Sequence, residues 1–187
     1  MILEMAHTWY EKTRKTSPWD TALFREVYNM TNDARGAFGE DIFSKAIHSL
    51  KWNIQMDTSN SNIHEDGHYD IKANNQRIEI KTSCLSKNSW QHEPLYKNDE
   101  CDWVVFIDFH YDFFYITIIK NNDLPLGKDS EFFKGKHATL RQNKSDGYKL
   151  DFSQKTINDL IKKNKCKKFN YDATIDEISV WIQEGFN

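Results

Sequence analysis

One set of residues in this sequence has the types and the spacing that metal-dependent hydrolysis needs. Its members are Asp70, Glu79 and Lys81, which lie in two β-rich runs at residues 69–73 and 76–82. Carboxylate oxygens are the protein ligands that Mg²⁺ prefers, and the bound metal lowers the pKa of a coordinated water. A lysine beside them can hold that water and stabilise negative charge that develops on a phosphate. The set therefore indicates hydrolysis assisted by Mg²⁺.

The turn between the two runs determines how these side chains face one another. Asn74 and Asn75 tolerate positive φ, which predicts a hairpin closed by a two-residue turn. In that register Asp70 lies opposite Glu79, and the two-residue period of a strand puts Lys81 on the same face as Glu79. Like charges placed directly opposite each other destabilise a sheet. A bound cation would offset this repulsion. The alternative interpretation is that the hairpin lies at the surface and water solvates its charged side chains.

A helix upstream is expected to bring a third carboxylate to this hairpin. The sequence predicts that it begins at Asn32 or Asp33 and runs to about Leu50, with an apolar face that recurs at helical spacing. The residues of this face are Phe38, Ile42, Phe43, Ala46, Ile47 and Leu50. At about 100° per residue, Glu40 falls on the edge of the face, where its carboxylate would look along the seam between helix and core.

The remaining pattern predicts an α/β (α+β) fold with one mixed central β-sheet flanked by helices. Further strands are predicted at residues 52–56, 102–109 and 113–120, and further helices from Ser17-Pro18 to about Met30, after Ser153, and after the capping box of Thr174 and Glu177. Residues 57–68 are expected to form a loop, and residues 121–150 to be irregular or to hold a short edge strand.

Length and composition indicate a single domain. The chain has 187 residues, of which 39% are hydrophobic, and it contains no repeat and no linker-like tract. We expect one domain over residues 1–187. Within it we expect an N-terminal helical segment at 1–35, a catalytic core at 36–120 and a C-terminal helical part at 121–187.

Charge and cysteine content restrict the partners and the compartment. The formal net charge is −3, whereas a self-sufficient sequence-specific DNA binder is usually basic. Cys84, Cys101 and Cys166 lie far apart without metal-site spacing, which predicts reduced thiols that are buried or half-buried. The sequence has no apolar run of membrane-spanning length and no apolar signal-peptide core near its start, so we expect a cytoplasmic protein that does not use a membrane.

The pattern of Glu40 on a helix, then Asp70, then Glu79-Ile80-Lys81 resembles the PD-(D/E)xK superfamily of nucleases with restriction-endonuclease-like folds. The resemblance implies a mixed sheet of four or more strands flanked by helices. It implies Mg²⁺-dependent hydrolysis of phosphodiesters in double-stranded DNA, with one or two metal ions, leaving 5′-phosphate and 3′-hydroxyl ends. By this resemblance, Asp70, Glu79 and the Ile80 carbonyl bind the metal, and Lys81 positions the attacking water. Glu40 adjusts the metal site, either as a further ligand or as a nearby contact.

The resemblance covers residues 36–84 and is not complete. Tyr69 stands where the motif has proline. Gln91, His92 and Tyr96 follow the second motif strand, where related nucleases carry a helical Gln and Tyr that assist the site. The spacing here is one residue longer and includes a proline, so we expect these three to be secondary site residues or part of a half-exposed loop.

In length and order of segments, the chain is similar to the small subunits of heterodimeric type IIS restriction endonucleases. This similarity implies a domain that cuts one DNA strand while a large partner subunit recognises the site. Two alternatives are a self-sufficient repair or junction-cutting nuclease of the same fold and a non-catalytic interaction subunit. An intact set of Asp70, Glu79 and Lys81 argues against the non-catalytic alternative.

One further motif suggests different chemistry. His64 and His68 match the HExxH spacing of zinc proteases, which brings two histidines together only on a helix. Gly67 interrupts the motif, polar residues precede it and a strand is predicted directly after it. A polar loop is therefore the favoured interpretation, and a zinc protease the minor one.

Overall fold

The computed structural model describes residues 17–56, 69–95, 101–124, 141–142 and 148–186. Its central sheet has six strands in the order β1-β2-β3-β5-β6-β9. These strands are β1 (Ile54–Met56), β2 (Ile71–Ala73), β3 (Gln76–Cys84), β5 (Trp103–Phe109), β6 (Phe113–Lys120) and β9 (Cys166–Asn170). Strands β3 and β5 pair in parallel and the other neighbours pair antiparallel, so the sheet is mixed, as predicted.

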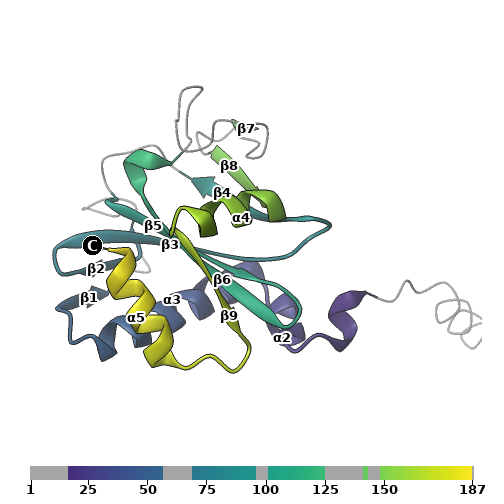
Figure 1. Cartoon of the computed structure of the whole chain (residues 1–187), viewed down its shortest axis with the longest axis horizontal. Coiled ribbons are helices and arrows are strands. Elements are labelled where there is room, and N and C mark those ends of the chain that lie inside the picture. Colours follow the sequence, from purple (N-terminus) through teal and green to yellow (C-terminus); the bar gives the residue numbers. More distant parts are fainter. Residues whose placement is uncertain (1–16, 57–68, 96–100, 125–140, 143–147, 187) are drawn as a thin grey trace, which may run out of the picture.

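A second, antiparallel sheet and several helices pack around the central one. The small sheet has the order β4-β8-β7 and consists of β4 (Ser89–Leu95), β7 (Arg141–Gln142) and β8 (Tyr148–Ser153). The helices are η1 (Pro18–Thr21), α2 (Arg25–Asn29), α3 (Asn32–Ser49), η2 (Asn121–Asp123), α4 (Gln154–Lys162) and α5 (Ile175–Gly185). Figure 1 shows α3 and α5 on one side of the central sheet, and α4 with β4 and β8 on the other.

The side chains of β5 show why both faces of the sheet are covered. All seven residues of this strand are buried, and successive side chains point to opposite faces. Val105 and Ile107 belong to the hydrophobic cluster that includes Phe43 of α3. Val104 and Phe106 belong to a second cluster, which includes side chains of β4, β8 and α4. The fold therefore has two cores, one on each face of the central sheet.

Helix α3 matches its prediction closely. It starts at Asn32, and the Thr31 side chain caps it by accepting the N–H of Ala34 at 3.2 Å. Gly39 lies on the buried side of the helix, where a β-carbon would come within 1.8 Å of the Thr82 hydroxyl oxygen. The absence of a side chain at Gly39 therefore lets α3 approach strand β3 closely.

Two glycines of α3 provide a paired test of this close approach. We expect Gly39→Ala to destabilise the fold by about 1–3 kcal/mol, because Thr82 and the helix must move apart. We expect Gly36→Ala to stabilise it by about 0.5–1 kcal/mol, since nothing lies within 4 Å of the added carbon and alanine favours the helix. Urea unfolding of both variants measures the difference. Equal stability of the two variants would contradict the close contact.

The predicted hairpin is also confirmed. Strands β2 and β3 pair with Ala73 opposite Gln76 and Ile71 opposite Ile78. Asn74 and Asn75 have φ values of 48° and 63°, as a two-residue turn with both central residues at positive φ requires. The two isoleucines are fully buried in the core on the side of α3 and α5.

The first predicted helix is wrong in its extent. Ser17 and Pro18 do start a helical turn, but it ends at Thr21, and Ala22 is extended. The chain is drawn to the turn between β5 and β6, where the N–H of Phe24 donates to the Tyr111 carbonyl at 3.1 Å. This tertiary hydrogen bond divides the apolar stripe between η1 and the short α2.

Three strands were not expected. Strand β4 lies where a half-exposed loop was predicted, and β8 and β9 lie in the C-terminal part, which was predicted to be helical with at most a short edge strand. The helices α4 and α5 are present there as expected, and both hydrogen bonds of the capping box between Thr174 and Glu177 are formed. Residues 57–68 and most of 125–147 lie outside the described residues.

Two further features of the described residues concern membrane-spanning helices and the cysteines. No helix among these residues combines the length and the apolar character needed to cross a membrane. All three cysteines are free and buried. Burial raises the pKa of Cys84 to about 11 and the pKa values of Cys101 and Cys166 to about 12, so these thiols are poor nucleophiles.

Candidate active site

The Asp70 carboxylate is held at the edge of strand β3. The ladder of the hairpin ends at Ile71 and Ile78, and the N–H of Asp70 donates to the Ile78 carbonyl at 2.9 Å. Oδ2 of Asp70 then accepts the N–H of Ile80 at 2.6 Å. The register had predicted that Asp70 pairs with Glu79. The ladder does not continue that far, so this prediction is wrong. A charge-assisted hydrogen bond to the β3 backbone takes the place of that pair.

Glu79 and Lys81 lie on the same face of β3, as alternation predicts, and their side chains form an ion pair. The exposed fractions of these side chains are 15% for Glu79 and 20% for Lys81. Ile78, which precedes Glu79, and Ile80, which lies between Glu79 and Lys81, are buried in the core on the opposite face. A lysine that is largely shielded from water interacts more strongly with nearby negative charge than a fully exposed one.

Glu40 lies within electrostatic range of both Asp70 and Lys81. Burial raises the pKa of the Glu40 carboxyl above its usual value. The negative charge of Asp70 raises this pKa further, while the positive charge of Lys81 lowers it. The helix edge therefore brings a second carboxylate toward the hairpin, as the sequence predicted, and the two carboxylates repel each other.

These side chains line one cleft of about 590 Å³ between α3, β3 and β4. The residues that line it include Asp33, Arg35, Glu40, Asp70, Ile80, Lys81, Gln91 and His92. Glu79 is not among the residues that line the cleft, but its side chain forms an ion pair with Lys81, which does line it. The structure therefore gathers Glu40, Asp70, Ile80 and Lys81 directly at the cleft, with Glu79 in contact through Lys81.

The predicted secondary residues are divided by the structure. Gln91 and His92 both line the cleft, from strand β4 and not from a loop or helix. Gln91 is exposed, whereas only 2% of His92 is exposed. Tyr96 lies outside the described residues, as do His64 and His68 of the HExxH match.

His92 reaches from the cleft into the core and meets a buried carboxylate. Its Nε2 lies 2.9 Å from Oδ1 of Asp108, which is completely buried on β5. Burial raises the pKa of Asp108, and His92 acts in the opposite direction. Neither ring nitrogen of His92 and neither Asp108 oxygen has a further hydrogen-bond partner within the described residues. The pair joins the two sheets directly behind the cleft.

The other end of the hairpin is held by a second ionic contact. The Asp102 carboxylate accepts the backbone N–H of Arg77 at 2.7 Å and two guanidinium N–H groups at 3.3 and 3.1 Å. Partial burial alone would raise the pKa of Asp102, but the hydrogen bonds from Arg77 outweigh it and lower the pKa. The start of β3 is thereby fixed to the start of β5.

The lowered pKa of Asp102 predicts how its contribution changes with pH. The folded protein holds this group charged, so its stabilisation is present above the usual pKa of 3.8 and is lost as pH falls through the lower folded value. We expect Asp102→Asn to cost up to about 1 kcal/mol at pH 7, since both partners are about one-third exposed. Urea unfolding should show that this cost shrinks below pH 4. A cost that is the same at pH 7 and pH 3, or an equal cost for the exposed Asp159→Asn, would argue against the ionic contact.

Sequence reasoning missed Asp108, the most deeply buried carboxylate of the site region. It stands in an otherwise apolar strand, where an ionisable residue on the core side is a signal that another group pairs with it.

Arg35 was also not singled out, although it lines the cleft. Its guanidinium donates to the carbonyls of Val27, Tyr28 and Met30, so it mainly holds α2 against α3.

The carboxylates of the cleft fit a hard divalent cation. Mg²⁺ typically takes one or two carboxylates and keeps several waters, and the Asp70 carboxylate, the Glu40 carboxylate and the Ile80 carbonyl offer oxygen donors of this kind. A cation there would offset the repulsion that raises the pKa of Glu40. Within the described residues no group of three or more His, Cys, Asp or Glu side chains is placed to enclose a metal. The donor set therefore fits a partly hydrated Mg²⁺ and not a closed structural metal site.

Comparison with known proteins adds no assignment. No protein-family model matches the chain, and a search of curated proteins finds no match. The chemistry of the cleft must therefore be judged from its own residues. Two carboxylates that repel each other, a backbone carbonyl and a shielded lysine can bind a cation and stabilise an anionic reaction centre.

Proposed function

We propose that this chain is a Mg²⁺-dependent DNA endonuclease domain of the PD-(D/E)xK type. The observation that carries the proposal is the position of the Asp70 carboxylate, 2.6 Å from the Ile80 N–H, in one cleft with Glu40 and Lys81. These residues come from a helix, a hairpin end and a strand that are separated in sequence. A solvated surface hairpin would give no reason for such a convergence or for a shielded lysine.

Each residue has a defined part in phosphodiester hydrolysis. Asp70 and the Ile80 carbonyl would hold Mg²⁺, with Glu79 or Glu40 as a further ligand, and the metal supplies a water of lowered pKa and charge stabilisation. Lys81 positions the attacking water and stabilises charge on the phosphate oxygens. Glu79 holds the Lys81 ammonium near the cleft through their ion pair. The oxygen of the water bonds to phosphorus and loses a proton to solvent, while the bond from phosphorus to the 3′ oxygen breaks and that oxygen takes up a proton. The products are 5′-phosphate and 3′-hydroxyl ends.

The fold agrees with the proposal in outline and differs in one detail. A mixed central sheet with α3 and α5 on one face and α4 on the other fits the arrangement that the resemblance implies. The crossover from β3 to the parallel β5 carries strand β4, where related nucleases carry a helical Gln and Tyr. Gln91 therefore comes to the cleft from a strand. This difference supports only an accessory role for Gln91, such as contact with the DNA backbone.

The charge of the chain favours a subunit over a self-sufficient enzyme. DNA binding draws much of its affinity from lysine and arginine contacts to phosphates, and this chain has a net charge of −3. We therefore propose that it is the small catalytic subunit of a heterodimeric type IIS restriction endonuclease. A large partner would recognise the site, and this subunit would cut one strand.

Plasmid cleavage tests the proposal. Purified protein is incubated with supercoiled plasmid in Mg²⁺, alone and with a candidate large subunit encoded beside it. Double-strand breaks at one site by the pair, with little cutting by the chain alone, support the subunit assignment. Efficient cutting by the chain alone would replace it with a self-sufficient nuclease of the same fold. If neither preparation cuts DNA, the nuclease assignment fails and a non-catalytic interaction subunit is favoured.

A further inference from the structure

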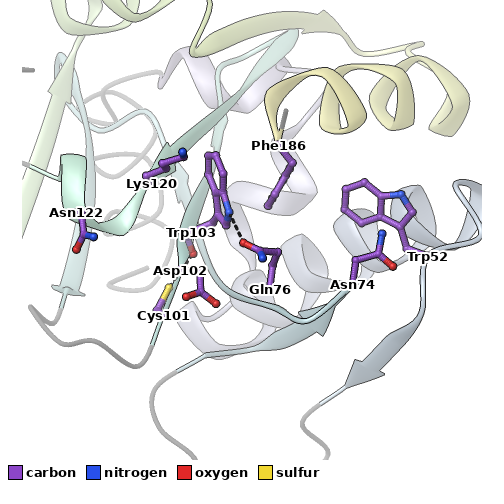
Figure 2. A pocket seen from close by; sticks show the side chains of 9 residues that line it. All are labelled: Trp52, Asn74, Gln76, Cys101, Asp102, Trp103, Lys120, Asn122 and Phe186. Atoms are coloured by element: carbon purple, nitrogen blue, oxygen red, sulfur yellow. Dashed lines mark hydrogen bonds between the residues drawn. The ribbon is translucent and has the colours of Figure 1, made fainter.

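A second pocket lies at the far end of the β2–β3 hairpin from the cleft. Its volume is about 620 Å³, within the range of small-molecule sites. It is formed by the hairpin turn, the start of β5, the end of β6 and the residue that follows α5. Figure 2 shows Trp103 and Trp52 on either side of Phe186, with Gln76 and Asn74 below them. No step of the proposed hydrolysis uses these residues.

The aromatic side chains give the pocket flat apolar walls. The ring centroids of Trp103 and Phe186 are 4.8 Å apart, and those of Trp52 and Phe186 are 5.7 Å apart at 84°. Trp103 is almost fully buried and fixed, whereas Trp52 and Phe186 are partly exposed. Partly exposed aromatic rings beside a pocket are suited to stacking against another planar group.

The hydrogen-bonding groups left over in the pocket are mainly donors. Trp103 Nε1 can only donate, and it occupies the Gln76 amide oxygen at 3.0 Å, which leaves the Gln76 amide N–H groups for a ligand. The Asn74 amide oxygen likewise accepts the N–H of Asn53 at 3.1 Å. The Lys120 ammonium lies 5.3 Å from the centre of the Trp103 ring. Among the described residues, the lining carboxylate is Asp102, and it is already bound by Arg77.

From this chemistry we propose that the pocket binds one nucleotide of a DNA strand. A planar ring with carbonyl or ring-nitrogen acceptors fits between the aromatic side chains and the amide donors, and an attached phosphate fits the Lys120 ammonium. That the nucleotide belongs to DNA rests on the function proposed above. Gln76 and Lys81 are five residues apart on β3, roughly 17 Å at the rise of a strand. The pocket would therefore hold a nucleotide about five positions from the cleaved phosphate.

A binding experiment without cleavage tests this site. A 5′-fluorescein-labelled single-stranded 12-nucleotide DNA is titrated with the wild-type chain in EDTA, and anisotropy reports binding. Single-stranded DNA is chosen because no base pair must open for a base to enter the pocket. We expect Trp52→Ala to weaken binding at least about fivefold and Trp52→Phe to restore most of it. Tyr171→Ala removes a more exposed aromatic ring that lies outside the pocket, and it should leave binding unchanged.

Competition separates recognition of the base from attraction to phosphate. We expect dGMP to compete with the labelled DNA for the wild-type chain and deoxyribose 5-phosphate to compete much less. The site is overturned if the wild-type chain does not bind the DNA, if Trp52→Ala binds it as well as wild type, or if both competitors act equally. Because EDTA excludes cutting, failure of the nuclease assignment would appear separately, as binding through Trp52 without Mg²⁺-dependent cleavage.

Discussion

Replacing Asp70 by Asn is expected to lower the rate of Mg²⁺-dependent DNA cleavage at least about 100-fold while the protein stays folded. The asparagine oxygen can still accept the Ile80 N–H that Asp70 now accepts at 2.6 Å, so the end of the hairpin keeps its place. The change removes the negative charge that would hold the metal. Lys81→Met should cause a loss of similar size, because it keeps the length of the side chain and removes the ammonium. Initial rates of duplex cleavage measure both effects.

A nearby carboxylate on the same helix as Glu40 serves as the matched control. Asp41 pairs with Lys45 on the outer face of α3, and both side chains are more than half exposed. Asp41→Asn should therefore cleave DNA at the wild-type rate. Thermal unfolding of all three variants shows whether the fold is retained. A folded Asp70→Asn protein with wild-type activity would remove the basis of the site assignment.

The largest expected effect on stability comes from Asp108. Asp108→Ala should cost about 3 kcal/mol, because it leaves His92 without its carboxyl partner in the core and opens a cavity between the two sheets. For a chain of this size, that loss should lower the midpoint of thermal unfolding by roughly 6–12 °C. Urea unfolding at pH 7 measures the free energy directly.

A double variant distinguishes loss of the pair from loss of volume. His92→Leu combined with Asp108→Val replaces the pair by apolar side chains of similar size, and we expect its stability to lie within about 1 kcal/mol of wild type. The two sheets would then pack without a buried ionisable pair. A double variant as unstable as Asp108→Ala would mean that the pair is not what makes Asp108 important for the fold.

The hairpin and helix α3 could be predicted because local chemistry determines them. The two asparagines at positive φ set the register of β2 and β3, and the apolar stripe of α3 sets which side of the helix is buried. Glu40 and Lys81 reached the same cleft as a consequence of these two elements. Direct opposition of Asp70 and Glu79 was predicted from the same register. It fails because the Asp70 carboxylate accepts a backbone N–H from β3.

Strands β4 and β9 could not be predicted because tertiary pairing determines them. Their sequences are rich in polar residues and, in β9, in lysine, so neither shows the period of a half-buried strand clearly. β9 is a strand because it pairs with β6 at the edge of the central sheet, and β4 because it pairs with β8. The His92–Asp108 contact depends on β4, so it could not be predicted either.

Reversible removal of metal tests the central claim most directly. The wild-type chain, with its candidate large subunit, is incubated with end-labelled duplex DNA in Mg²⁺, then in EDTA, and then with Mg²⁺ restored in excess. Our account predicts that strand cleavage stops in EDTA, returns with Mg²⁺ and leaves 5′-phosphate ends. Cleavage that continues unchanged in EDTA, or no cleavage in any of the three conditions, would contradict it.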